Sequence, residues 1–433
     1  MGGATGAARA YVRSLRPDLP RAMWVVVGAQ LLSAIGTGFV LPFGTIYLHF
    51  VRGIPIPVVG TVISTISLGG LVVNFAGGGL IDRFGARRVV LGGVGFQAAG
   101  FLVFAFAAEV PVAFAAALLA GIGNGLFFPA MATVIANLTT SRQRSGAASL
   151  QYVAINIGIG LGSVIGGFVV SVQHPSTFVA VYLANAVSFA VFGLLIAAWV
   201  PELRTGPAQT AAGGPPRAPD RQPRSGYRAV LRDRAFLGLV GFNSVVVMTG
   251  YAQLDSAMPL YAKTYLGVQP SALGLILAAN TAFIVVLQLP ITRAVRHLRR
   301  TRVLAAFAGT WAVAWLIGFG ASAMTGLAAA VGLGVTAVVF GIGECLLTST
   351  MAPLSMDLAP ETARGTYMAS VSLSWSVGLL VGPALGGVVV GSALHQAFWP
   401  LLALSAVGLV GWALALEARI PGGANRPAAP ANP

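Results

Sequence analysis

Apolar runs long enough to cross a lipid bilayer recur along almost the whole chain, and they constrain its fold more than any other feature. A membrane-spanning helix needs about 20 predominantly apolar residues, because only internal hydrogen bonds can satisfy a backbone in lipid. We therefore predict an all-α membrane protein with twelve transmembrane helices, near residues 23–48, 57–80, 89–107, 111–137, 146–172, 176–199, 236–262, 271–292, 303–321, 326–355, 366–391 and 397–417.

Charge is too sparse for a water-soluble protein. Only 9% of the residues are Asp, Glu, Lys or Arg, against roughly 25% in soluble domains. The net charge of +15 does not indicate nucleic-acid binding, since the basic residues cluster in every second connection between apolar runs rather than on one face. The single cysteine, Cys345, rules out an intramolecular disulfide. The first apolar run, after Met23, is too long for a cleaved signal peptide and is predicted to be the first span.

The distribution of basic residues predicts the orientation in the membrane. Lys and Arg accumulate in cytoplasmic loops of membrane proteins. All of the basic residues except Arg52 and Lys263 fall in the segments before the first span, in alternate loops, in the 201–234 stretch or after the last span. We therefore expect both termini to be cytoplasmic, in a multi-pass protein of a bacterial cell membrane.

A stretch rich in Pro, Gly, Ala and Arg divides the chain. Residues 201–234 include six prolines and cannot bury much apolar surface, so they are predicted to be a flexible cytoplasmic linker. The predicted domains are an N-terminal six-helix bundle over residues 1–200 and a C-terminal six-helix bundle over residues 235–420. Residues 421–433 are predicted to be a disordered tail.

The two halves are related in sequence. The triplet at residues 121–123 recurs 220 residues later at 341–343, and Arg144 has Arg364 at the same displacement. Four glycines of the first half, Gly158, Gly162, Gly166 and Gly167, match Gly378, Gly382, Gly386 and Gly387. Internal repeats of this kind predict a transporter with two pseudo-symmetric bundles and a site between them near the bilayer midplane.

The loop after the second span carries a specific motif, Gly78-Gly79-Leu80-Ile81-Asp82-Arg83-Phe84-Gly85-Ala86-Arg87-Arg88. It resembles the signature of the major facilitator superfamily, G-x-x-x-D-[RK]-x-G-[RK]-[RK], and departs from it at Ala86. The resemblance implies that Asp82 helps to latch the two halves on the cytoplasmic side, with Gly78, Arg83, Gly85, Arg87 and Arg88 completing the latch. A solvated turn that obeys the positive-inside rule is the plainer explanation.

A second motif lies in the fifth span as Gly158-x-x-x-Gly162-Ser163-x-x-Gly166-Gly167. It resembles the antiporter signature of the superfamily's drug exporters, with Ser163 in place of Pro. The eleventh span carries the same pattern with its proline, Pro383. Small residues four apart let membrane helices approach closely, so plain helix packing also accounts for the pattern.

Two acidic residues, Glu344 in the tenth span and Asp255 in the seventh, lie within apolar runs. A charged side chain at the bilayer centre costs roughly 2.5–3.5 kcal/mol on insertion scales, and burial favours the neutral form of a carboxyl. We predict that Glu344 and Asp255 are proton-coupling residues. A neutral acid bonded to a neighbouring helix is the plainer alternative, more so for Asp255, which is near the outer end of its span.

The repeat pairs Glu344 with Asn124 in the fourth span, where many facilitators carry an Arg that is absent here. Carboxylates in the seventh and tenth spans resemble the LmrP-like proton-driven multidrug exporters. Other polar and soft side chains within spans are candidates for the substrate cavity, although an interhelix hydrogen bond is the likelier role of each one alone: Gln30, Asn124, Gln151, Tyr152, Asn156, Asn243, Met248, Tyr251, Asn280 and Trp375. Met248, Tyr251 and Asp255 are expected on one helical face.

These features predict a secondary active transporter that exports lipophilic small molecules, cationic ones among them, in exchange for protons. We expect a monomer in contact with membrane lipids, with no cofactor, no metal and no nucleic-acid partner. A proton-coupled symporter for a nutrient such as a sugar shares the fold and stays open as an alternative. The chain has no motif of a membrane-embedded enzyme, and a two-fold repeat does not supply the residue ring of a passive channel.

Overall fold

A computed structural model describes residues 19–202 and 224–426. It contains twelve helices, some of them composite, that are long and apolar enough to cross a membrane. The first half comprises α2 (Arg21–Val40) continued by α3 (Gly44–Ile46) and η1 (Tyr47–Val51), α4 (Ile56–Phe84), α5 (Ala86–Ala105), α6 (Val110–Leu138), α7 (Ser141–Val169) and α8 (Pro175–Trp199). These confirm the six spans predicted for this half.

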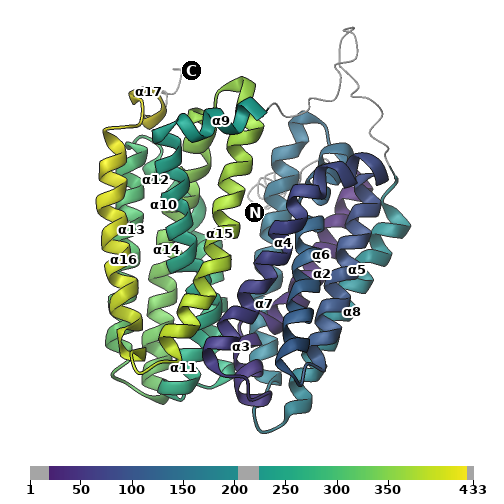
Figure 1. Ribbon diagram of the computed structural model, residues 1–433, viewed down its shortest axis with the longest axis vertical. Coiled ribbons are helices and arrows are strands. Elements are labelled where there is room, and N and C mark those ends of the chain that lie inside the picture. The colour runs from purple at the N-terminus through teal and green to yellow at the C-terminus, as the bar shows by residue number, and fades with distance from the viewer. Residues whose placement is uncertain (1–18, 203–223, 427–433) are drawn as a thin grey trace, which may run out of the picture.

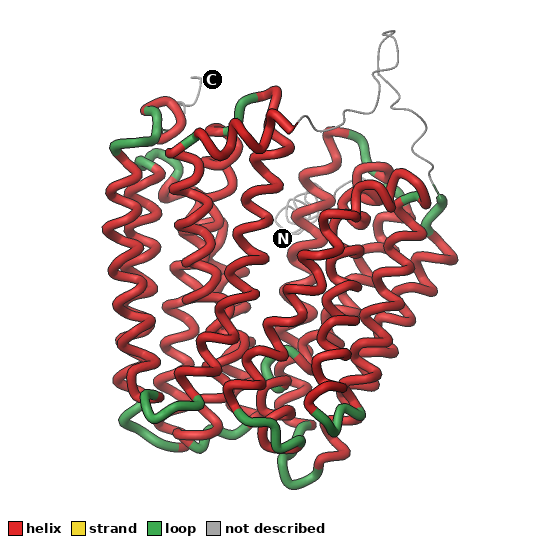
Figure 2. Tube along the Cα trace, viewed as in Figure 1, coloured by secondary structure: helices red, strands yellow, loops and turns green. Residues whose placement is uncertain are grey.

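The second half repeats this arrangement of six spans. Its first span is composite, made of α10 (Arg234–Val246), the π-helical segments η2 (Val247–Tyr251) and η3 (Gln253–Ala257), and α11 (Met258–Leu266). The other spans are α12 (Pro270–Val295), α13 (Arg300–Ala321), α14 (Gly326–Leu358), α15 (Arg364–Val390) and α16 (Phe398–Glu417). Figure 2 shows helix throughout both halves, joined by short loops.

Local chemistry fixes several helix ends. Prolines occupy the first helical positions of α4, α6, α8 and α12, where a missing N–H costs nothing and the fixed φ suits a helix. Gly85 separates α4 from α5 with φ of 85°, a conformation that side chains with a Cβ rarely adopt. The turn between the second and third spans therefore depends on this glycine.

Two short helices lie in segments predicted to lack structure. The helix α9 (Arg224–Arg232) falls within the predicted 201–234 linker, and its Val230 is buried against Phe236 and Tyr367 of the second half. The helix α17 (Gly422–Asn425) falls within the predicted tail. There the Asn425 side chain accepts a hydrogen bond of 3.0 Å from the backbone N–H of Thr301 at the start of α13. The rest of the linker, 203–223, and the tail beyond residue 426 lie outside the described residues.

The two halves meet at one end of the molecule. We call the face where α2 begins and α16 ends the terminal face, and the face where α4 and α12 begin the distal face. In Figure 1, α4 and α15 approach each other toward the distal face and diverge toward the terminal face. Hydrogen bonds between the halves lie on the distal side, from Thr45 Oγ1 to the Ser256 carbonyl at 3.1 Å and from the Ala384 N–H to Ser64 Oγ at 3.1 Å.

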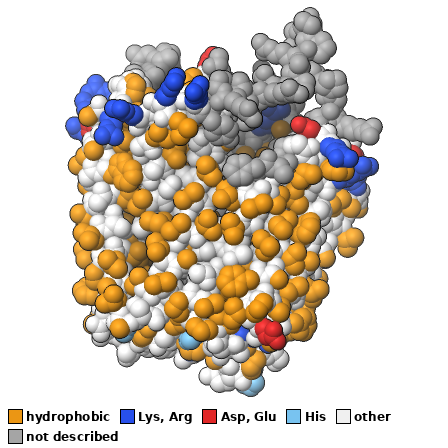
Figure 3. Space-filling model, in the orientation of Figure 1, with side chains coloured by type: hydrophobic (Ala, Val, Ile, Leu, Met, Phe, Trp, Pro, Cys, Tyr) orange, Lys and Arg blue, Asp and Glu red, His pale blue; other side chains and the backbone are white. Residues whose placement is uncertain are grey.

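Glycines allow the close approach at this distal seam. A Cβ added to Gly387 of α15 would lie 3.0 Å from the Ile56 carbonyl of α4, and one added to Gly167 of α7 would lie 2.8 Å from the Pro270 carbonyl of α12. Figure 3 shows Lys and Arg side chains along the terminal face and apolar side chains around the middle of the molecule. The chain is thus a two-bundle membrane protein that is closed distally in this conformation.

Candidate functional site

Glu344 lies near the middle of α14, and two side chains of the composite span α10–α11 lie beside it. The Tyr251 hydroxyl is a hydrogen-bond partner of the Glu344 carboxyl. Asp255 is close enough to interact electrostatically with both Glu344 and Tyr251. Among the described residues, no Lys, Arg or His forms an ion pair with either acid within 4.0 Å. The structure therefore brings the two intramembrane acids together, and neither has a basic partner within residues 19–202 and 224–426.

The π-helical turns of this span position Tyr251 and Asp255. Tyr251 ends η2, and Asp255 lies within η3. The Gln253 side chain stabilises the break from regular helix, since its Nε2 donates to the Met248 carbonyl at 2.8 Å and to the Gly382 carbonyl of α15 at 2.8 Å. Single π-turns within helices are frequent at functional sites. The prediction of one helical face assumed regular α-helix and did not anticipate these turns.

Aromatic rings surround Tyr251. Its ring centroid is 4.8 Å from that of Trp375 and 5.6 Å from that of Trp311, and Phe340 stacks on Trp311 at 4.1 Å. Trp375 is 38% exposed, whereas Trp311 and Phe340 are fully buried. Trp311 packs where Gly343 has no side chain and donates its Nε1–H to the Phe340 carbonyl at 3.0 Å. Trp311 and Phe340 pack against Tyr251 and support the site. Neither was predicted from the sequence, since nothing there distinguishes them from other core aromatics.

The first half contributes Tyr152 of α7. Tyr152 interacts electrostatically with Glu344 and Tyr251 and is 48% exposed. Its neighbour Gln151 donates to Gln30 Oε1 at 3.4 Å, and Asn156 Nδ2 donates to the Tyr152 carbonyl at 2.9 Å. We call Tyr152, Tyr251, Asp255, Glu344 and Trp375 the inter-half site, because both halves contribute to it.

Other polar residues predicted to line the cavity make hydrogen bonds between helices of one half. Asn124 accepts from Gln97 Nε2 of α5 at 2.5 Å, and Asn243 donates to Ser374 Oγ of α15 at 2.7 Å. Asn280 Nδ2 donates to the Ala337 carbonyl of α14 at 2.7 Å. Met248 contributes its carbonyl to the Gln253 bond described above. Among the described residues, no hydrogen bond joins these four residues to Glu344 or Asp255.

The glycine motifs pack their helices against the first span of each half. Gly158, Gly162 and Gly166 of α7 face α2, and Ser163 is buried with its hydroxyl 3.4 Å from the Gly38 carbonyl. Gly378, Gly382 and Gly386 of α15 face the composite span α10–α11. Gly167, Pro383 and Gly387 face the opposite half instead, at the distal seam. One face of each motif helix therefore packs within its own bundle, and another face packs against the opposite half at the distal seam.

The loop predicted to form a latch lies at the terminal face within the first half. Arg87 and Arg88 form ion pairs with Glu202 at 4.0 Å and 3.6 Å, and the Arg83 guanidinium is 5.2 Å from the centroid of the Phe84 ring. Asp82 is exposed, and no ion pair that reaches it is found in the described part of the chain. Gly78 lies in α4, but its surroundings are outside what the structure describes.

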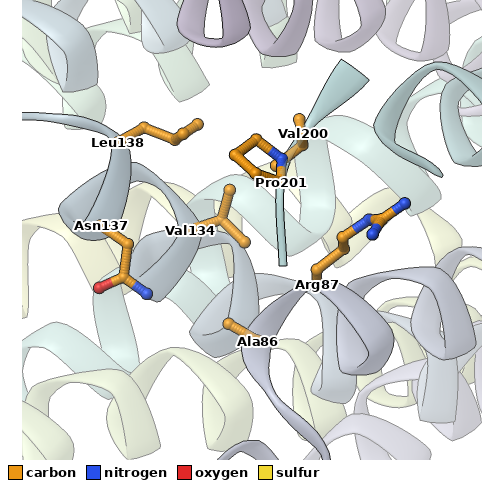
Figure 4. Close-up of a pocket in the computed structure, with 7 residues that line it drawn as sticks. All are labelled: Ala86, Arg87, Val134, Asn137, Leu138, Val200 and Pro201. Atoms are coloured by element: carbon orange, nitrogen blue, oxygen red, sulfur yellow. The ribbon is translucent and has the colours of Figure 1, made fainter. Parts of the chain in front are cut away.

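A small cavity lies beside this loop, between α5, α6 and the end of α8 (Figure 4). Its volume is about 10 Å³, which is room for about one water molecule. Arg87 and Asn137 are polar side chains at its wall. A cavity of this size holds no substrate. The pair of intramembrane acids is what makes the inter-half site the candidate functional site.

The family is shown by comparison with known proteins. The family model described as Major Facilitator Superfamily matches residues 26–267 and 240–432. The chain therefore belongs to the major facilitator superfamily, and it is a membrane transporter rather than an enzyme. A solved POT family transporter, in complex with a thioalcohol conjugated peptide, superposes with a TM-score of 0.74 at 13% identity, over 93% of this chain and 97% of the other. That likeness shows the fold alone.

Sequence relatives span almost the full length of the chain. The uncharacterized MFS-type transporter YqjV of Bacillus subtilis is 27% identical, over 86% of this chain and 87% of the relative. Multidrug resistance protein MdtH of Aeromonas salmonicida is 28% identical, over 89% of this chain and 92% of the relative. A Na(+), Li(+), K(+)/H(+) antiporter of Planococcus maritimus is 25% identical, over 81% and 85%.

Proposed function

We propose that this transporter exports lipophilic small molecules, cationic ones among them, in exchange for protons. The observation that carries the proposal is the pair of acids, Glu344 and Asp255, beside the exposed aromatic rings of Trp375 and Tyr152, with no basic partner. Similarity to the MdtH multidrug resistance proteins supports the same function.

The chemistry of exchange follows from the two states of the Glu344 carboxyl. Protonated, it is neutral; ionised, it accepts a hydrogen bond from the Tyr251 hydroxyl. When the proton leaves, the carboxylate has no nearby cation, so it attracts a positively charged substrate that stacks on Tyr251 and Trp375. The proton and the cation compete for one negative charge, which makes their transport mutually exclusive and opposite in direction. A neutral lipophilic substrate has no charge to pair with the carboxylate. It would compete with the proton only by filling the space beside the same aromatic rings.

The orientation of the faces completes the proposal. The terminal face carries most of the basic side chains in Figure 3 and is the cytoplasmic face by the positive-inside rule. The described conformation, closed at the distal seam, then faces the cytoplasm. Alternating access follows from opening that seam and closing the terminal ends of the two bundles, near Asp82.

A second candidate function is exchange of monovalent metal cations for protons. Two carboxyls that face one space favour it, since carboxylate oxygens bind alkali cations, and one relative is an antiporter of that kind. We rank it second, because the aromatic rings around the carboxyls offer a lipophilic cation more contact than a hydrated metal ion.

Transport in inverted membrane vesicles tests the proposal. We expect a lipophilic cationic dye to be taken up when a proton gradient, acidic inside, is imposed, and uptake to stop when the gradient is dissipated. Na⁺, K⁺, sugars and amino acids are measured in parallel. Gradient-dependent exchange of Na⁺ or K⁺ without dye transport would favour the second candidate, and uptake of a sugar or amino acid would favour the nutrient symporter.

Cysteine labelling tests the orientation. In a Cys345→Ser background, a cysteine placed in the 203–223 segment is expected to resist a membrane-impermeant maleimide in intact cells and to react in inverted vesicles. A cysteine in place of Gln173, in the loop between α7 and α8, serves as the opposite control. Labelling of the 203–223 cysteine in intact cells would reverse the assignment of the faces.

A further inference from the structure

A strip of polar side chains lies between α12 and α14 on the terminal side of the inter-half site. Gln288 Nε2 donates to Ser349 Oγ at 3.2 Å, and its Oε1 accepts from Thr348 Oγ1 at 3.2 Å. The hydroxyls of Thr292 and Ser349 are 2.6 Å apart, and Gln288 Nε2 also donates to Thr292 Oγ1 at 3.2 Å. The four side chains form one hydrogen-bonded group, which we call the polar strip, and the sequence analysis singled out none of them.

The polar strip begins at Glu344. Thr348 lies one helical turn farther along α14 toward the terminal face, and its hydroxyl donates to the Glu344 carbonyl at 2.9 Å. Thr292 is the farthest member and lies within one turn of the end of α12 at Val295. Residues four apart lie on one helical face, so Thr348 lies on the Glu344 face of α14, and the strip continues from there toward the terminal face.

The strip is able to hold water. Thr348 is exposed, and the other three side chains are half-buried. A hydroxyl has one hydrogen, so Thr292, Thr348 and Ser349 each donate either to a carbonyl of their own helix, at 2.7–2.9 Å, or to a neighbour within the strip. A hydroxyl that has donated its hydrogen keeps acceptor capacity, which is available to a water molecule. Apolar side chains of the same size would offer none.

The repeat shows that this polarity is not a consequence of the fold. At the displacement of 220 residues, Thr348 and Ser349 correspond to Phe128 and Pro129 in α6. Phe128 is 64% exposed. The first half thus presents an apolar side chain where the second presents hydroxyls, just as it has Asn124 where the second has Glu344.

We propose that the polar strip is the route by which the proton of Glu344 reaches the terminal face while a lipophilic substrate occupies the inter-half site. This inference rests on the proposed proton exchange. The O–H bond of the protonated Glu344 carboxyl breaks, the proton passes to a water held at Thr348, and the carboxylate keeps the electron pair. Waters held at Gln288, Ser349 and Thr292 carry the proton onward.

The experiment compares Thr348→Val and Thr292→Val, singly and together, with Thr310→Val in α13. Thr310 is half-buried, and its hydroxyl donates to the Ala306 carbonyl of its own helix at 2.8 Å, so the control loses a similar hydroxyl away from the strip. Two rates are measured in proteoliposomes with a lipophilic cationic dye. One is dye uptake driven by a proton gradient, and the other is dye–dye exchange at equal pH, which needs no net proton movement.

We expect each strip variant to slow gradient-driven uptake by about three- to tenfold, the effect of one lost hydrogen bond on a barrier. Exchange at equal pH should stay as in the unaltered protein, and Thr310→Val should change neither rate. Equal slowing of both rates would assign the strip to helix packing and overturn the proposal. Unchanged gradient-driven uptake in the double variant would overturn it as well.

Glu344→Gln, measured in parallel, separates this proposal from the function on which it rests. If Glu344→Gln keeps gradient-driven uptake, Glu344 is not the proton carrier. The role proposed for Glu344 is then wrong, and so is the proton route that begins there. If Glu344→Gln abolishes uptake while the strip variants transport at the full rate, the proposed function stands and only the route is wrong.

Discussion

The two halves of this transporter use the same backbone packing and different chemistry. Gly162 of α7 lies against the first span of its half, and Gly382 of α15 lies against the corresponding span of the second half. Gly123 leaves room for Gln97 of α5, and Gly343 leaves room for Trp311 of α13. The repeat thus preserves the positions where helices approach closely, since any added side chain there would clash.

The halves differ at the residue that follows Gly123 in the first half and Gly343 in the second. In the first half, Asn124 accepts a hydrogen bond from Gln97 and is tied to its own bundle. In the second half, Glu344 bonds to Tyr251 and faces Tyr152 of the opposite half. The comparison teaches that in this chain the repeat sets the architecture, whereas the proposed coupling chemistry lies in the positions at which the halves differ.

Among the variants considered, Glu344→Gln is expected to have the largest effect on transport. Glutamine keeps the size and most of the hydrogen bonding but cannot carry a proton, so proton-driven accumulation should fall by about tenfold or more. Downhill exchange should persist. The matched variant in the first half, Asn124→Ala, should keep coupling and only lower stability through the loss of the Gln97 bond. If Glu344→Gln accumulates substrate normally, the functional difference between the halves is not at this position.

Gly162→Val and Gly382→Val test whether the two halves share the same helix packing. Each added side chain would meet the neighbouring span, at Ile35 or at Ala252, and overpacking of this kind costs about 1–3 kcal/mol. We expect both variants to lower the thermal unfolding midpoint in detergent by similar amounts. Gly309→Val, with no neighbouring atom within 4 Å of its Cβ position, is the control. A loss of stability in only one half would show that the two packings are not equivalent.

Asp82→Asn is expected to have a moderate effect. In the described conformation Asp82 is exposed, so we expect its charge to stabilise the conformation in which the terminal ends close. One exposed charge contact is worth up to about 1 kcal/mol, or up to about a fivefold shift of the conformational balance. Cysteine accessibility at the two faces measures that balance. Glu202→Gln, which removes contacts within the first half only, should leave the conformational balance unchanged. Wild-type transport by Asp82→Asn would show that Asp82 is not a latch.

Asp255→Asn is expected to have the smallest effect. Asp255 belongs to the same site as Glu344, but Tyr251 bonds to Glu344. A partly hydrated charge contact is worth up to about 1 kcal/mol, so KM for a cationic dye should rise by about two- to fivefold. KM for a neutral lipophilic substrate should not change. Loss of all coupling in Asp255→Asn, with coupling retained in Glu344→Gln, would reverse the order of the two acids.

Much of the architecture was predictable, because the bilayer permits few solutions. The length of the apolar runs predicted all twelve spans, and the repeated glycines predicted the two halves. Glu344 and Asp255 stood out from the sequence because acids are costly in a span. Thr348 and Gln288 did not, since hydroxyl and amide side chains are common in membrane helices and only their neighbours make them a group.

The sequence by itself determined the class of protein, the number of spans and the identity of the intramembrane acids, since each follows from the cost of placing polar groups in lipid. Only the tertiary structure decided which polar residues meet. It placed Tyr152 of one half beside Glu344 of the other, directed Asn124 to Gln97 instead, and turned Tyr251 and Asp255 toward Glu344 through the π-helical turns. The reason is that the direction of a side chain depends on local helix geometry and on neighbours distant in the chain, neither of which a residue's own type or spacing fixes.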